Sequence, residues 1–226
     1  GVKSSLGMGA ISSRFLLTEN GRALAKEYIA GCAYSGKVPV PLYQYADMVR
    51  QQKQGDGWLT MEALKEAYKH MVVTDEILNN IGPAVNSGKS FLIYGQPGNG
   101  KTFLAEALFN VDDTYIYVPH AIECQGMIIQ MFDPVYHHPV DDEAEQISAF
   151  TTESTYDKRW FKTRRPFIVS GGELDLKMLD LSFNPVSKYY DAPLQLKANN
   201  GIYLIDDFGR QKTTPAEVLN RWIVPM

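Results

Sequence analysis

The stretch that most restricts the fold of this chain is FLIYGQPGNGKTFLAEAL, residues 91–108. A mostly apolar run leads directly into a segment with three glycines and a proline, and a lysine, a threonine and a helix-like pattern follow. Gly95, Gly100, Lys101 and Thr102 match the pattern G-x-x-x-x-G-K-[ST] in full. That pattern binds phosphate groups when a strand precedes it and a helix follows it. We therefore expect a phosphate-binding loop here, with residues 92–94 as the strand.

Each residue type in this segment suits phosphate chemistry. Glycines let the backbone curl so that successive N–H groups point at phosphate oxygens. The helix expected to start near Lys101 adds its positive dipole end, and the Lys101 ammonium supplies a charge for the β and γ phosphates. The Thr102 hydroxyl is a suitable Mg²⁺ ligand. The alternative, a glycine turn that arises by chance, is disfavoured because both flanking elements are predicted.

A second motif, GIYLIDDFG, places two carboxylates at the end of an apolar run. A phosphate site needs a distant acidic group to organise its metal, and we expect Asp206 to hold Mg²⁺ through water and Asp207 to orient the attacking water as a base. The alternative is an ordinary solvated start of a loop. The four apolar residues before the pair and the glycine-rich segment favour the functional interpretation, because ligands bind at strand ends of such sheets.

The rest of the chain predicts an α/β fold with a mainly parallel sheet flanked by helices. The β-rich runs are residues 116–120, 167–172 and 202–207, and helical patterns cover residues 103–109, 174–181 and 193–198. Residues 1–73 are predicted to be a separate region of short helices, including one at 18–30, one behind Pro41 and one behind Thr60, and residues 74–226 the α/β core.

Composition and charge exclude several classes of protein. The net charge of −4 argues against a protein that coats nucleic acid through general basicity, although a local basic groove stays open. No run approaches 18 apolar residues, and the first ten residues lack the apolar core of a signal peptide. We therefore expect a cytoplasmic protein with no membrane partner.

At these residues the sequence resembles a AAA+ ATPase, the ring-forming branch of the P-loop NTPases. YGQPGNGKT is similar to that branch's phosphate loop, and APLQLKANNGIYLIDDFG resembles the helix before the acidic motif of the MoxR-like and enhancer-binding subgroup. The run from IGPAVNSGKS onward resembles bacterial predicted ATPases with chaperone activity, over roughly residues 74–226.

This resemblance implies an ATPase that exchanges ATP and ADP, uses Mg²⁺, forms a homo-oligomeric ring when full length, and remodels a protein or nucleoprotein partner. It implies Lys101 and Asp207 as catalytic residues and an adenine site near Ile81 and Gly82. The loop residues implied to contact nucleotide are Gly95, Pro97, Gly98, Asn99, Gly100, Lys101, Thr102 and Phe103.

The chain departs from the family in two respects, and its N-terminal part carries a separate, weaker resemblance. The acidic motif is Asp206-Asp207 where Asp-Glu is commonest, which leaves the rate of hydrolysis open. Sensor residues, an arginine finger and a helical lid should follow, and with about twenty residues left we expect them to lie outside this chain. ISSRFLLTENGRALAKEYI resembles the wing strand and last helix of a winged-helix domain, but the preceding helices are missing, and a helical adaptor is an equal alternative.

The sequence also bears on two further functions and two further sites. A scaffold that closes on ATP and scarcely hydrolyses it stays open, whereas a small-molecule kinase lacks a recognisable acceptor pocket. A metal loop at His120, His137 and His138 is disfavoured for want of ligand spacing, and residues 132–162 are expected to be a surface insertion. The basic cluster is predicted to be a solvated face, with subunit or polymer contacts as alternatives: Lys158, Arg159, Lys162, Arg164 and Arg165.

Overall fold

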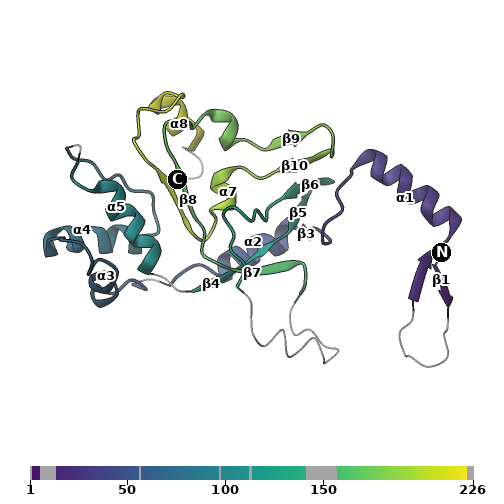
Figure 1. Cartoon of the computed structure of the whole chain (residues 1–226), viewed down its shortest axis with the longest axis horizontal. Coiled ribbons are helices and arrows are strands. Elements are labelled where there is room, and N and C mark those ends of the chain that lie inside the picture. The colour runs from purple at the N-terminus through teal and green to yellow at the C-terminus, as the bar shows by residue number, and fades with distance from the viewer. Residues whose placement is uncertain are drawn as a thin grey trace.

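A computed structural model of the chain describes residues 2–5, 14–55, 57–96, 98–111, 114–140 and 157–222. Within these residues the protein is α/β, with helices, one mixed five-stranded sheet and three two-stranded sheets. Figure 1 shows an elongated arrangement, in which a group of helices lies at one end, the sheets lie in the middle, and helix α1 projects at the other end.

The largest sheet has the strand order β3-β5-β6-β10-β9. Its pairs β3/β5 and β6/β10 are parallel, and β5/β6 and β9/β10 are antiparallel. Its strands are β3 (Val40–Pro41), β5 (Ala121–Cys124), β6 (Met127–Gln130), β9 (Ser182–Asn184) and β10 (Tyr189–Asp191).

Two further strand pairs lie beside this sheet. β4 (Tyr115–Pro119) and β7 (Trp160–Arg164) are antiparallel. β8 (Phe167–Ser170) and β11 (Ile202–Ile205) are parallel and run in register along their whole length.

The expectation of a mainly parallel sheet is therefore wrong, and a two-residue turn is one reason. Gln125 and Gly126 have φ angles of +52° and +78°, and they join Cys124 to its cross-strand partner Met127. Left-handed torsions at both central residues are the geometry of a type I′ hairpin, whose twist matches that of the flanking strands. The turn returns the chain antiparallel at β5/β6, where a helical crossover would have kept the strands parallel.

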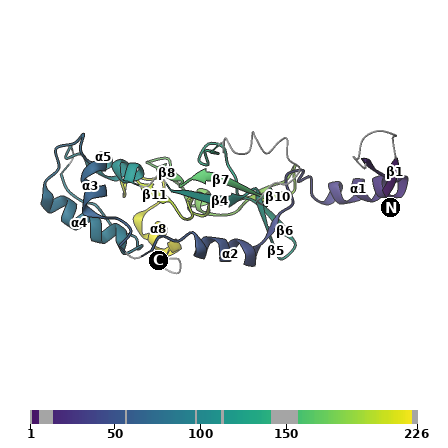
Figure 2. The same ribbon diagram turned by 90° about the horizontal axis from the view of Figure 1, so that it is seen from below.

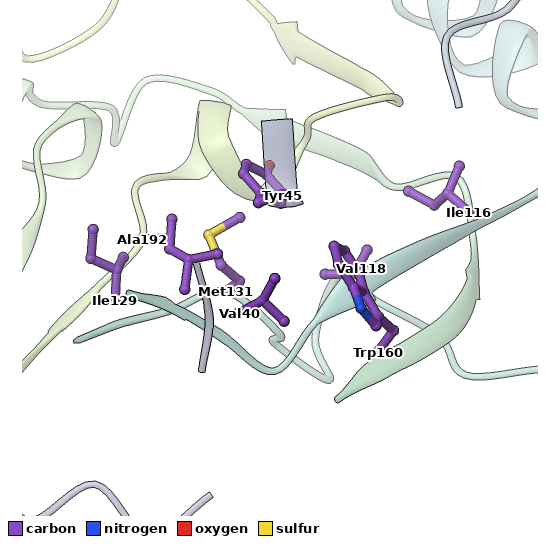
Figure 3. Close-up of a cluster of buried hydrophobic side chains, with 9 residues drawn as sticks. Val40, Tyr45, Ile116, Val118, Ile129, Met131, Trp160 and Ala192 are labelled. Carbon is purple, nitrogen blue, oxygen red and sulfur yellow. The ribbon is translucent and has the colours of Figure 1, made fainter. Parts of the chain in front are cut away.

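Helix α2 (Leu42–Gln51) covers one face of the sheets, as Figure 2 shows. It starts directly after Pro41, as predicted, and Tyr45 is its buried residue. Tyr45 belongs to the cluster of Figure 3, which draws side chains from α2, the large sheet and the β4/β7 pair into one core. The cluster consists of Val40, Tyr45, Ile116, Val118, Ile122, Ile129, Met131, Trp160 and Ala192.

The helical group contains α3 (Met61–Ala67), α4 (Asp75–Asn86), α5 (Lys101–Ala107) and the 3₁₀ helix η1 (Leu108–Val111). Thr60 caps α3 as predicted, because its hydroxyl accepts a 3.2 Å hydrogen bond from the Ala63 N–H. The predicted boundary between the two regions falls after residue 73. The core of this helical group contains residues from both sides of that position, because α3 and α4 pack together. The helical core consists of Leu59, Leu64, Ala67, Tyr68, Leu78, Ile81, Leu104, Ala107 and Leu108.

The N-terminal segment forms a hairpin of β1 (Val2–Ser5) and β2 (Arg14–Leu17), followed by α1 (Glu19–Gly31). The predicted helix is confirmed, and the Thr18 hydroxyl caps it by accepting from the Gly21 N–H at 3.2 Å. No residue of α1 is buried. Contacts just after the helix hold it to the sheet, where the Ala33 N–H donates to the Ser187 carbonyl at 2.8 Å.

The C-terminal part contains the 3₁₀ helix η2 (Leu176–Leu179), α7 (Leu194–Lys197) and α8 (Pro215–Trp222). Leu174, Leu179 and Val218 form a third core against which Tyr203 and Ile205 of β11 pack. Ile202, at the start of the same strand, packs instead against the helical core. Strand β11 thus lies between two cores.

Candidate functional site

The glycine-rich loop, residues 95–100, leads into α5, which begins at Lys101 as predicted. Gly98 and Gly100 have φ angles of +83° and +69°, in the left-handed region that favours glycine. A Cβ built on either residue would meet no heavy atom within 4 Å. Backbone torsion, and not crowding, is therefore what requires glycine here. Pro97 lies outside the described residues.

The expected strand at residues 92–94 is absent, and this corrects the prediction. Residues 91–95 have no regular secondary structure, and the side chains of Leu92 and Tyr94 are 68% and 87% exposed. A strand needs a neighbour to take up its main-chain hydrogen bonds, and none of the described strands lies in register with this run. The phosphate-loop pattern thus has its following helix but not its preceding strand.

Lys101 folds back over the loop. Its ammonium donates hydrogen bonds to the main-chain oxygens of Gly95 at 3.1 Å and Gln96 at 3.0 Å. Asn99 and Phe103, both expected to contact a ligand, are exposed on the same part of the chain, with the Phe103 side chain 68% exposed. A cation and accessible loop atoms therefore gather at the start of α5.

The structure brings Thr102 and Asp206 together although 104 positions separate them. The Thr102 hydroxyl lies 3.2 Å from Oδ1 and 3.1 Å from Oδ2 of the Asp206 carboxylate. Asp206 follows directly after β11, and its N–H donates to the Ser170 carbonyl at 2.8 Å, which extends the β8/β11 pairing by one residue. The parallel pair thus holds the carboxylate at the first turn of α5.

Asp207 occupies an exposed turn beside Asp206. Its φ angle is +50°, a left-handed torsion that Asp adopts more readily than most residues. Its N–H donates to Asp206 Oδ1 at 2.9 Å, and its carboxylate lies 3.8 Å from the Arg210 guanidinium. Arg210 thus adjoins the Asp207 carboxylate.

Ile81 and Gly82, the residues expected near adenine, lie in the middle of α4. Both are buried, and Ile81 belongs to the helical core together with Leu104 of α5. In this arrangement they offer no exposed surface to a purine ring.

His137 is a buried residue of the fold. The Asp133 N–H donates to its Nδ1 at 2.9 Å, so its Nε2 donates to the Lys197 carbonyl at 2.9 Å. Burial lowers the pKa of His137, and the same cause lowers the pKa of His120. A surface location is therefore wrong for this part of the expected insertion, and residues 141–156 lie outside the described residues.

Sequence reasoning missed the charged side chain at the centre of that network. The Lys197 side chain is 5% exposed, and its ammonium pairs with Asp133 at 2.8 Å and Asp191 at 2.9 Å. Within the described ranges, no three His, Cys, Asp or Glu side chains gather closely enough to hold a metal ion.

Two arginines of the basic cluster have partners within the fold. Arg159 pairs with Asp157 and donates to the Gln44 side chain at 3.1 Å. Arg165 donates to the Thr114 hydroxyl and to the carbonyls of Gln52 and Asn200, at 2.7 to 2.9 Å. Arg165 therefore links three segments and is not simply a solvated charge.

Comparison with known proteins adds no assignment. No model of a known protein family matches the chain, and no curated protein matches it either. Among the residues that the structure describes, no helix has the length and apolar character needed to cross a bilayer.

Proposed function

We propose that this chain is an ATP-binding and ATP-hydrolysing module of the AAA+ branch of the P-loop NTPases. The observation that carries the proposal is the contact between Thr102 at the glycine-rich loop and Asp206 at the end of β11. These two residue types, on those two elements, are what a nucleotide site needs to hold a metal beside phosphates. The left-handed glycines of the loop and the position of Lys101 support it.

The donor set fits Mg²⁺. Thr102 offers a hydroxyl oxygen and Asp206 a carboxylate, and Mg²⁺ prefers such oxygens while keeping several waters and taking others from phosphate. Two protein groups therefore suffice. When bound, the metal would neutralise charge that develops on the β and γ phosphates.

The other residues would act directly on nucleotide or water. Lys101 would exchange its two carbonyl partners for phosphate oxygens, where a charged acceptor makes a stronger bond than a neutral one. Asp207, exposed beside Asp206, would accept the proton of the attacking water. The protein would exchange ATP and ADP as a homo-oligomeric ring. It would couple this cycle to remodelling of a protein or nucleoprotein partner.

Titration calorimetry with Mg-ATP tests the nucleotide site through Lys101→Ala. Loss of a charge-assisted bond of about 1.5 to 3 kcal/mol should weaken binding about ten- to hundredfold. Lys89→Ala is the matched control, because Lys89 is exposed shortly before the loop. Equal affinity in the wild type and Lys101→Ala would refute the phosphate assignment.

The metal assignment has its own test in Thr102→Ala. This variant should lose the part of the affinity that depends on Mg²⁺ and keep the part measured in excess EDTA. Thr102→Ser retains the hydroxyl and should retain the Mg²⁺ dependence. A Mg²⁺ effect that survives Thr102→Ala unchanged would remove this residue from the proposed metal site.

A further inference from the structure

The side-chain amide of Gln211 makes three hydrogen bonds to the turn after β11. Its Nε2 donates to the main-chain oxygens of Asp206 at 2.8 Å and Asp207 at 3.1 Å. Its Oε1 accepts from the Gly209 N–H at 2.7 Å. Since an amide has two N–H donors and one carbonyl, both of its donors and its acceptor are in use.

The turn that Gln211 contacts has an unfavourable backbone. Asp207 at φ +50° and Gly209 at φ +100° both have positive torsions. A left-handed torsion costs roughly 1 to 2 kcal/mol at a residue with a side chain, so Asp207 needs stabilising contacts. The Arg210 N–H closes the turn on the Asp207 carbonyl at 2.9 Å, and the Asp206 carboxylate accepts from the Asp207 N–H. Gln211 adds further side-chain bonds to the same turn.

We propose that Gln211 is a positioning residue for hydrolysis, which holds Asp207 in its left-handed torsion so that the carboxylate lies beside Asp206. This inference rests on the proposed function, since it assigns Gln211 a role only through Asp207. Gln211 has no hydrogen bond to Lys101 or Thr102. It should therefore affect the hydrolytic step and leave nucleotide affinity unchanged.

The isosteric variant Gln211→Glu separates this role from simple packing. It keeps an oxygen to accept from Gly209 and replaces the donating nitrogen with an oxygen that repels the carbonyls of Asp206 and Asp207. Gln211→Asn keeps the amide but is one methylene shorter. Asn220→Ala is the control, because it removes an exposed amide from nearby α8.

The experiment measures kcat and KM for Mg-ATP, affinity by calorimetry, and hydrogen exchange of the Gly209 amide by NMR. For Gln211→Glu we expect kcat to fall about tenfold to hundredfold, as small misplacements of catalytic groups do. We expect affinity within twofold of the wild type and faster Gly209 exchange. The kcat of Gln211→Asn should lie between those of Gln211→Glu and the wild type. Asn220→Ala should match the wild type in kcat, affinity and Gly209 exchange.

Two results would overturn the inference. Unchanged kcat in Gln211→Glu together with faster Gly209 exchange would show that the turn does not control hydrolysis. Unchanged Gly209 exchange would show that the amide does not hold the turn. A wild type that binds no Mg-ATP is a different result, since it would refute the proposed function and the catalytic role of Gln211 with it. Circular dichroism melting of each variant checks that its fold is intact.

Discussion

The phenol oxygen of Tyr68, at the end of α3, lies 2.5 Å from the main-chain oxygen of Leu104 in α5. That carbonyl lacks its usual helical donor, because the Leu108 N–H bonds to Ala105 as α5 tightens into η1. Tyr68 therefore donates to a group that the end of the helix has left free. Burial raises the pKa of Tyr68 to about 12, so the phenol keeps its proton at neutral pH.

We predict that Tyr68→Phe lowers the free energy of unfolding by about 1 to 3 kcal/mol, because the Leu104 carbonyl stays buried without a donor. Urea unfolding followed by circular dichroism measures the change. Tyr28→Phe is the matched control, since Tyr28 is 68% exposed on α1. Equal midpoints for Tyr68→Phe and the wild type would show that the bond contributes nothing net.

Asp207→Asn should keep the turn and lose hydrolysis. Asn tolerates a left-handed torsion as well as Asp does, so the backbone at φ +50° needs no change. Removal of a general base lowers rates by about 10²- to 10⁴-fold, and we expect that loss in phosphate release with ATP affinity retained. Asp47→Asn, which alters an exposed ion pair with Arg50, is the control. Equal turnover in Asp207→Asn and the wild type would exclude Asp207 as the base, and negligible turnover in the wild type would favour the scaffold alternative.

Lys197→Met should destabilise the protein strongly. It removes the ammonium that pairs with Asp133 and Asp191 and leaves the Asp133 carboxylate, which is 22% exposed, without a counter-charge. Breaking a buried ion pair costs about 3 kcal/mol or more. Thermal and urea unfolding would measure the loss, and Lys177→Met at an exposed position should be close to neutral. A fully stable Lys197→Met would mean that the pair is replaceable by apolar contact.

His137 should make stability depend on pH between neutral and mildly acidic conditions. The folded-state pKa is lowered from the ordinary 6.5, so below about pH 6.5 the unfolded chain binds more protons and the free energy of unfolding falls as pH falls. Protonation also removes the Nδ1 lone pair that accepts from the Asp133 N–H. Stability measured from pH 7 to pH 5 should decline less steeply in His137→Asn than in the wild type. Identical slopes would exclude His137 as a cause of the pH dependence, and the lowered pKa of His120 contributes a slope of the same sign.

Local patterns in the sequence predicted local structure correctly. The cap at Thr60 is confirmed. The start of α8 has a similarly local motif, a capping box in which the Glu217 carboxylate accepts from the Thr214 N–H at 2.9 Å. Both depend on residues three positions apart, so the information needed lies within one turn of helix. The start of α5 at Lys101 follows in the same way from the glycines before it.

Features that depend on distant partners could not be predicted in this way. Residues 91–94 have the composition of a strand, but a strand forms only beside another, and composition does not identify the neighbour. The burial of Lys197 depends on two carboxylates on other segments. In the candidate site, the chemistry of Thr102 and Asp206 indicated that they would meet, whereas no pattern pointed to Gln211.

Strand β11 ends at the residue before Asp206, and its side chains contribute to two cores. Ile202 packs against the helical core, whereas Tyr203 and Ile205 pack against the C-terminal core. Packing against both cores therefore fixes the position and orientation of the Asp206 carboxylate at the end of the strand. If the proposed hydrolysis is correct, a random-mutagenesis search for inactive but folded variants should return substitutions from both cores, at residues that do not line the proposed nucleotide site.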